Sequence, residues 1–163
     1  MFNPEIHHRK SIRLQEYDYS EPGPYFVTAC IYNMEKLLGK IVEGEINLNQ
    51  YGEIVKRCWD YLPKHYENMI LDAFVIMPNH VHGIILLSEI GPEKGKKVTL
   101  SEVIRGFKTY SARRINDLRK TKGVPVWKRN YYEHIVRNEE ELNNIREYII
   151  NNPLGWEKDE YFR

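Results

Sequence analysis

Two short apolar runs, ILDAFVIM over residues 70–77 and HVHGIILL over residues 80–87, are separated only by Pro78 and Asn79. Both runs are rich in branched aliphatic residues, which favour β-strands, and the Pro-Asn pair is typical of a turn. Because so short a connection leaves no room for a crossover, we expect the two strands to pair antiparallel. This pair constrains the fold more than any other stretch of the chain.

The preceding segments add further elements to this strand pair. A Pro/Gly turn at residues 21–24 leads into a β-rich run over residues 25–32, and short strands are predicted around Gly44. Between residues 49 and 61 the apolar residues recur at helical spacing, and Pro63 is expected to close that helix. The first half of the chain therefore predicts strands, a helix and the strand pair.

The C-terminal half predicts a helix, a strand and another helix. Thr99-Leu-Ser-Glu102 reads as a capping box at a helix start. The buried stripe of that helix is predicted to contain Ile104, Phe107, Ile115 and Leu118. The stretch VWKRNYYEHIVR (126–137) predicts a strand. Asn138 is expected to cap a last helix that ends near Asn151–Asn152, since Pro153 follows.

The resulting order is strand, helix, strand, strand, helix, strand, and then an extra C-terminal helix. This is the order of a ferredoxin-like (RRM-like) α+β fold, an antiparallel sheet with two helices on one face. The length of 163 residues suits one compact core, so we expect a single domain over residues 1–163. The order of elements alone fixes no function.

Composition narrows the setting in which the chain works. No apolar run approaches the length of a membrane span, and the N-terminal MFNPEIHHRKSIRL has no signal-peptide core. Cys30 and Cys58 lack the spacing of a metal site, and we expect them to be buried thiols. These features favour a cytoplasmic protein with no membrane partner.

Charge is spread unevenly along the chain. Residues 89–130 contain twelve Lys or Arg against four Asp or Glu, although the net charge of the whole chain is only +1. A basic block on an otherwise acidic chain indicates a polyanionic partner on one face. The alternative is that this helix and loop simply face solvent.

His80 and His82 stand one residue apart at the start of the second strand of the pair. Side chains two apart on a strand share one face, and their Cα atoms should lie roughly 6.6 Å apart. Two imidazoles at that separation can converge on one cation, with Val81 packed into the core behind them. The alternative is a pair of polar residues on the solvated face of a sheet.

The stretch MPNHVHGIILL resembles the HUH motif (histidine, bulky hydrophobe, histidine) of the single-tyrosine transposases. Two other stretches, YDYSEPGPYFVTACIYN and VWKRNYYEHIVRNEEELNNIREYIINNP, resemble the same family. The resemblance runs from about residue 11 to residue 156, and the C-terminal stretch is most similar to the REP-associated tyrosine transposases. It implies a metal-dependent endonuclease and strand transferase for single-stranded DNA that works through a 5′-phosphotyrosine link.

The same resemblance implies the site residues. His80 and His82 would ligate a divalent cation, Tyr148 would be the nucleophile, and Asn152 would supply a further metal ligand. A spacing of four residues puts Tyr148 and Asn152 on one helix face. Two alternatives remain: in one, Tyr148 is part of the apolar stripe of that helix, and in the other, Tyr110 on the basic helix is the nucleophile.

The resemblance favours Mg²⁺ or Mn²⁺, although imidazole ligands also suit zinc. Single-stranded or hairpin DNA is the expected partner, held through phosphates and through bases stacked on aromatic rings. The predicted DNA-binding residues are Arg105, Lys108, Arg113, Arg114, Lys128, Arg129, Tyr131 and Tyr132.

Three other functions remain open from the sequence. They are an inactive DNA-binding protein with the same fold, an RNA-binding module with the same sheet order, and a zinc hydrolase, although no HExxH motif is present. Related proteins include dimers that share active sites and single-chain forms, so the sequence leaves both a monomer and a homodimer open.

Overall fold

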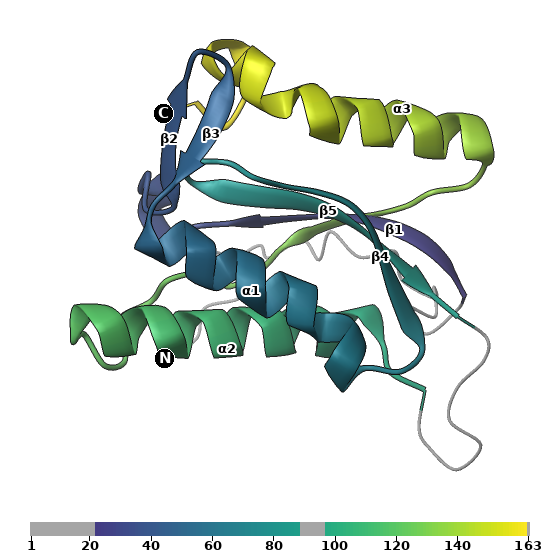
Figure 1. Cartoon of the computed structure of the whole chain (residues 1–163). Coiled ribbons are helices and arrows are strands. Elements are labelled where there is room, and N and C mark those ends of the chain that lie inside the picture. Colours follow the sequence, from purple (N-terminus) through teal and green to yellow (C-terminus); the bar gives the residue numbers. More distant parts are fainter. Residues whose placement is uncertain (1–21, 89–96, 163) are drawn as a thin grey trace, which may run out of the picture.

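The computed structural model of the protein describes residues 22–88 and 97–162. Its centre is a four-stranded sheet in the order β4-β5-β1-β6, in which every neighbouring pair is antiparallel (Figure 1). The strands are β1 (Gly23–Cys30), β4 (Met69–Ile76), β5 (His80–Leu87) and β6 (Tyr132–Ile135). The predicted antiparallel pairing across Pro78 and Asn79 is therefore confirmed, as β4 and β5.

Three helices cover the two faces of this sheet. Helices α1 (Gln50–His65) and α2 (Leu100–Arg119) lie on one face, and α3 (Glu139–Asn151) lies on the other (Figure 1). A 3₁₀ segment, η2 (Asn152–Lys158), continues directly from α3. The predicted ferredoxin-like α+β fold with an extra C-terminal helix is confirmed.

A separate two-stranded hairpin completes the fold. Strands β2 (Gly39–Val42) and β3 (Glu45–Leu48) pair antiparallel around Gly44, and a short 3₁₀ segment, η1 (Tyr32–Met34), precedes them. Gly44 has a φ of 78°, in the left-handed region that favours glycine in a tight turn. The predicted short strands are present, but they form their own sheet.

Side-chain caps start the three helices. The capping box at Thr99 is formed in both directions, with the Glu102 side chain accepting from the Thr99 backbone amide at 2.8 Å. Asn138 caps α3 as predicted, and Asn49 caps α1. The expectation that Pro63 closes α1 is wrong: the helix continues to His65 with Pro63 in its last turn.

The main core lies between the sheet and the α1–α2 layer. Trp59 of α1 stacks on Phe74 of β4 with ring centroids 4.2 Å apart. Gly83 makes this possible, because a Cβ there would come within 2.5 Å of the Trp59 ring. Of the predicted α2 stripe, Ile104, Phe107 and Ile115 are buried, but Leu118 is 48% exposed.

The last strand is shorter than predicted. Only Tyr132–Ile135 pairs with β1, and the rest of the predicted stretch contributes an isolated bridge between Trp127 and Ile31. The ammonium of Lys108 on α2 accounts for the interruption, because it donates to the backbone carbonyls of residues 128, 129 and 130. Carbonyls that converge on one cation cannot form a strand ladder.

Two expectations about the setting can be compared with this fold. Cys30 and Cys58 are free but only partly buried, so burial of the thiols is incomplete. Among residues 22–88 and 97–162, no helix has the length and apolar character needed to cross a membrane.

Candidate active site

The histidine pair begins β5 and lies on the face of the sheet that α3 covers. In the register of β1 and β5, His80 lies opposite Cys30 and His82 opposite Thr28, while Val81 faces the main core. The two Nε2 atoms are 3.1 Å apart. Both side chains are fully buried, at 0% and 1% exposure. The alternative of a solvated polar pair is therefore wrong.

Hydrogen bonds to Nδ1 orient both rings. The Asn79 carbonyl oxygen Oδ1 lies 2.8 Å from His80 Nδ1, and it can only accept, so Nδ1 carries the proton. Asn79 is fixed in turn because its amide donates to the Tyr161 carbonyl at 2.8 Å. His82 Nδ1 lies 2.7 Å from the Thr28 hydroxyl, which can accept in the same way. When Nδ1 carries the proton on both rings, both Nε2 lone pairs are free to bind one cation.

Burial keeps both imidazoles neutral. It lowers the pKa of His80 to about 2, with a smaller contribution from the neighbouring His82, and it lowers the pKa of His82 to about 3. A protonated imidazole cannot bind a metal, whereas these rings are in the neutral, ligating form across the physiological pH range.

Helix α3 brings Tyr148 to this pair. Its hydroxyl lies 3.5 Å from His82 Nε2, and its ring is 44% exposed. The Phe26 ring holds both partners, because it stacks on His82 at 5.4 Å and meets Tyr148 edge-on at 6.2 Å. Ile149, not Tyr148, is the fully buried residue of this helix face. The rival Tyr110 lies on α2, in the layer on the other side of the sheet.

Two buried oxygens complete the site. Asn152 is in helical geometry at the end of α3, although it precedes a proline, and its Oδ1 has no hydrogen-bond partner among the described residues. Asp159 Oδ2 also lacks a hydrogen-bond partner there and lies 3.9 Å from His80 Nε2. Burying such oxygens unpaired costs free energy, which a cation would offset.

Asp159 is the residue that sequence reasoning missed. Its ligand atom and those of His80 and His82 all lie within 4.8 Å of one another. Its other oxygen accepts from the Tyr161 backbone amide at 2.8 Å, and the Tyr161 ring lies 4.4 Å from that of His80. The segment WEKDEYFR has no periodicity or motif that would single out one of its acidic residues. Two imidazoles with amide and carboxylate oxygens form a donor set that suits a divalent cation.

The pKa of Tyr148 is raised, mainly by burial and further by nearby acidic residues, while the Asn152 amide lowers it. The Asp159 pKa is also raised, again by burial. In the absence of a cation, burial therefore shifts the pKa of both groups upward. A positive charge placed between Tyr148 and Asp159 would lower the pKa of both groups.

The structure divides the predicted DNA-binding residues between two faces. Lys128, Arg129 and Tyr132 line a hollow of about 400 Å³ beside the site, together with Thr28 and Cys30. Tyr131 also borders this hollow, but it packs against the main core and its hydroxyl lies 3.3 Å from Ser101.

The α2 residues lie elsewhere. Arg105, Arg113 and Arg114 are exposed on the layer that faces away from the histidine pair. Lys108 is committed to the three backbone carbonyls of the 128–130 loop, and burial lowers its pKa to about 8. Because its ammonium already donates to the loop, Lys108 is the least available of the predicted DNA-binding residues for a phosphate contact.

Comparison with known proteins gives the family. The family model described as IS200-like transposase matches residues 40–152. An uncharacterised protein of Haemophilus influenzae is 40% identical, over 99% of this chain and 97% of its own length. A second protein of that organism, named "Putative REP-associated tyrosine transposase", is 24% identical over 84% of this chain and 73% of its own length.

A solved structure of a REP-associated tyrosine transposase bound to a REP hairpin has a similar fold. It superposes with a TM-score of 0.60 at 21% identity, over 86% of this chain and 73% of that protein. The predicted resemblance to the single-tyrosine transposases is thus confirmed. With the family model matching well over half of its residues, the chain belongs to the IS200-like transposase family.

Proposed function

We propose that this transposase nicks and rejoins DNA at the site formed by His80, His82 and Tyr148. The observation that carries the proposal is the position of the Tyr148 hydroxyl, 3.5 Å from His82 Nε2, beside two imidazoles whose Nε2 atoms converge. A nucleophile next to a cation-binding pair is an arrangement that supports phosphodiester transfer.

In the proposed reaction the Tyr148 oxygen attacks the scissile phosphorus. A bond from that oxygen to phosphorus forms, the bond from phosphorus to the 3′-oxygen breaks, and the phenol proton ends on the released 3′-hydroxyl. The product is a 5′-phosphotyrosine and a free 3′-end. Because the phosphotyrosyl bond keeps the energy of the phosphodiester, a second 3′-hydroxyl can reverse the step without ATP.

His80 and His82 would hold the divalent cation, with Asp159 or Asn152 as the oxygen ligand. The bound cation would neutralise charge on the phosphate and orient its oxygens. The oxygen ligand is compatible with Mg²⁺ or Mn²⁺, the cations that the family resemblance favours. Phe26 and Asn79 are positioning residues in this proposal: Phe26 contacts the nucleophile and one ligand, and Asn79 fixes the tautomer of the other.

A DNA hairpin with a single-stranded flank is the proposed substrate. Support comes from the similar structure described as bound to a REP hairpin. Lys128 and Arg129, exposed beside the site, would contact phosphates, and the 45% exposed Tyr132 would stack on an unpaired base.

The test is formation of a covalent protein–DNA adduct, seen on a denaturing gel with end-labelled hairpin DNA and Mn²⁺. Tyr148→Phe keeps the ring and loses the hydroxyl, so the adduct should vanish while DNA binding persists. Tyr110→Phe is the matched control and should leave the adduct in place. An adduct that persists in Tyr148→Phe, or in wild-type protein with EDTA, would refute the proposed nucleophile or the proposed metal dependence.

A further inference from the structure

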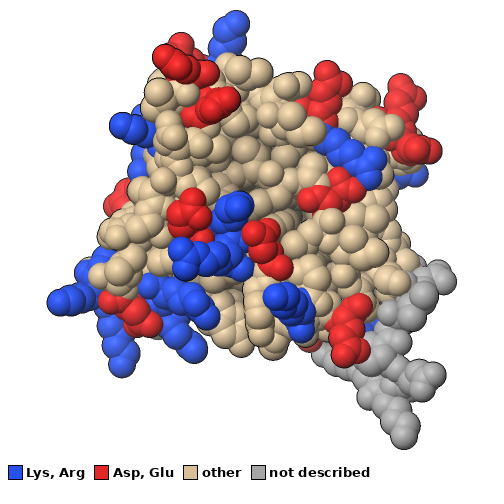
Figure 2. All heavy atoms as spheres, viewed as in Figure 1, with Lys and Arg blue, Asp and Glu red and all other residues tan. Residues whose placement is uncertain are grey.

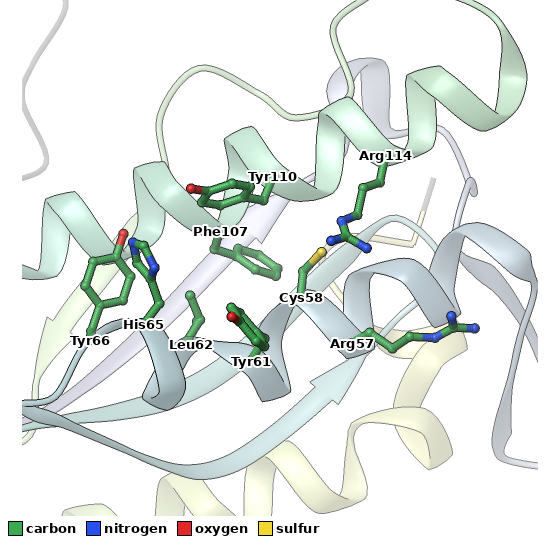
Figure 3. A pocket seen from close by; sticks show the side chains of 9 residues that line it. All are labelled: Arg57, Cys58, Tyr61, Leu62, His65, Tyr66, Phe107, Tyr110 and Arg114. Carbon is green, nitrogen blue, oxygen red and sulfur yellow. The ribbon is translucent and has the colours of Figure 1, made fainter.

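A second cavity lies between α1 and α2, in the layer away from the histidine pair. Its volume is about 400 Å³, within the range of roughly 300–1,000 Å³ that is common for ligand sites. The proposed nicking reaction uses none of its lining residues. Figure 3 shows them: Arg57, Cys58, Tyr61, Leu62, His65 and Tyr66 from α1 and its end, and Phe107, Tyr110 and Arg114 from α2.

Aromatic rings from both helices form the walls. Tyr61 is 59% exposed and Tyr110 is 48% exposed, while the buried Phe107 and Leu62 lie deeper (Figure 3). His65 meets the Tyr110 ring edge-on at 6.1 Å. Large rings left accessible over an apolar floor offer flat faces on which another ring can stack.

Positive charge lies at one end of this cavity. Arg114 reaches from α2 toward α1, and Arg57 extends along α1 (Figure 3). Within the described part of the chain, neither arginine forms an ion pair. Among the described residues, no carboxylate lines the cavity, so none of them competes with an outside anion for the two guanidinium groups.

An adjoining hollow of about 520 Å³ extends the same surface. It shares His65, Tyr66 and Tyr110 with the first cavity and adds the cations Lys97, Arg105 and Arg113. Its one acidic lining residue, Glu102, uses its carboxylate in the Thr99 capping box. In Figure 2, Lys and Arg are densest at the lower left of the molecule, and Asp and Glu side chains lie among them.

We infer that the α1–α2 cavity binds an unpaired base of single-stranded DNA, separately from the nicking site. The base would stack on Tyr61 or Tyr110, and the adjacent phosphates would lie on Arg57 and Arg114. Aromatic faces beside a cationic track are the combination by which proteins bind single strands. This inference rests on the proposed function only in taking DNA, and not RNA, as the nucleic acid.

Photo-crosslinking of the wild-type protein gives a direct test. A single-stranded oligo(dT) probe with one 5-iodouracil would be irradiated with the full chain, and the modified peptide identified by mass spectrometry. We expect crosslinks on Tyr61, His65 or Tyr110. Crosslinks confined to Tyr132 and the β6 region would overturn the inference. Stronger competition by oligo(U) than by oligo(dT) would overturn the assignment to DNA.

Two variants measure the contribution of the cavity. Tyr110→Ala should weaken oligo(dT) binding about ten-fold in fluorescence anisotropy, from the usual strength of base stacking. Arg57→Glu with Arg114→Glu should weaken it further and reduce its dependence on salt. The matched controls are Tyr32→Ala, 45% exposed on η1, and Lys56→Glu, exposed on α1 outside the cavity. An affinity within two-fold of wild type in both cavity variants would overturn the inference.

The adduct assay separates this inference from the proposed function. Tyr110→Ala should still form the covalent adduct when the hairpin is saturating, because the nicking site is intact. Conversely, Tyr148→Phe should bind oligo(dT) like the wild type. Loss of the adduct in Tyr110→Ala at saturating hairpin would overturn the claim that the cavity is separate from the nicking site.

Discussion

At the scale of single residues, two oxygens are candidate ligands for the proposed cation. Asn152 and Asp159 both present a buried oxygen without a hydrogen-bond partner among the described residues, but only Asp159 carries a charge. A carboxylate interacts more strongly with a divalent cation than an amide does. We therefore predict that Asp159→Asn weakens Mn²⁺ binding about ten-fold or more, and more than Asn152→Ala does. Isothermal titration with Mn²⁺ checks this without reference to activity.

The control for this prediction is Glu157→Gln, which removes an exposed carboxylate of η2 that does not line the hollow around Tyr148 and Asp159. It should leave Mn²⁺ affinity unchanged within about two-fold, since long-range charge is screened in water. The opposite ranking, with Asn152→Ala the weaker binder, would assign the ligand role to Asn152 as the sequence predicted.

The buried histidines also predict how stability depends on pH. Their pKa values of about 2 and about 3 in the folded protein lie below the ordinary value of 6.5. The unfolded chain therefore binds protons below pH 6.5 that the folded chain does not, and stability falls as pH falls. Without metal, the free energy of unfolding should drop by on the order of 2 kcal/mol per pH unit below pH 6.

Urea unfolding in EDTA at pH 7 and pH 5 measures this loss. The double variant His80→Gln with His82→Gln removes both titrating groups, so its stability should change less between the two pH values. Equal pH dependence in the variant and the wild type would show that other groups control acid sensitivity.

The sequence predicted much of this site, but not all of it. His80, His82, Tyr148 and Asn152 do meet, because strand alternation and helical spacing place them and the resemblance selects them. Asp159 could not be predicted, since its approach to His80 depends on how η2 turns the chain back over the sheet. Tertiary packing determines the path of the chain through η2, and the sequence has no periodic pattern that would indicate it.

At the scale of elements, the attachment of α3 to the sheet controls where Tyr148 lies. Arg146 of α3 donates from Nε to Asp72 Oδ1 at 2.9 Å, and its Nη2 pairs with Oδ2. Asp72 lies where the register of β4 shifts, between Leu71 and Phe74. This two-point contact joins the helix that carries the nucleophile to an edge strand.

We predict that Arg146→Gln slows adduct formation about ten-fold while changing the free energy of unfolding little. The ion pair is partly exposed, so solvent limits its contribution to stability. A small displacement of a nucleophile costs far more in rate. The charge swap Asp72→Arg with Arg146→Asp should recover part of the rate, and an unchanged rate in Arg146→Gln would show that α3 is held by its apolar contacts alone.

Elements with local signals were predicted well. The capping box of α2, the Asn138 cap of α3 and the β4–β5 turn all lie in a few consecutive residues. The errors concern distant contacts. The 126–137 stretch has strand-forming residues throughout, yet Lys108 from α2 draws part of its backbone away from the sheet. No pattern in a few consecutive residues of the sequence can predict such a long-range hydrogen bond.

At the scale of the whole molecule, the sheet separates two basic surfaces whose residues belong to one continuous stretch of the sequence. The basic block appears continuous from residue 89 to residue 130, but α2 lies beneath the sheet and Lys128 and Arg129 border the nicking site. If both surfaces bind DNA, one strand has to pass around the molecule, or two segments have to bind at once. Oligonucleotide length should therefore affect affinity more than it affects cleavage at saturation.

The other property of the whole molecule is that all residues of the proposed site come from one chain. Tyr148 and His82 are 3.5 Å apart within the same chain. In a dimer that shares its sites, the tyrosine would instead act with histidines of the partner. We predict that mixing Tyr148→Phe protein with His80→Ala protein restores no adduct, even after joint refolding. In the controls, each variant is mixed with wild-type protein. These mixtures should form adduct in proportion to the amount of wild-type protein present. Recovery in the mixture of the two inactive variants would mean that the chains exchange α3 in solution, because only then could an intact tyrosine and an intact histidine pair meet.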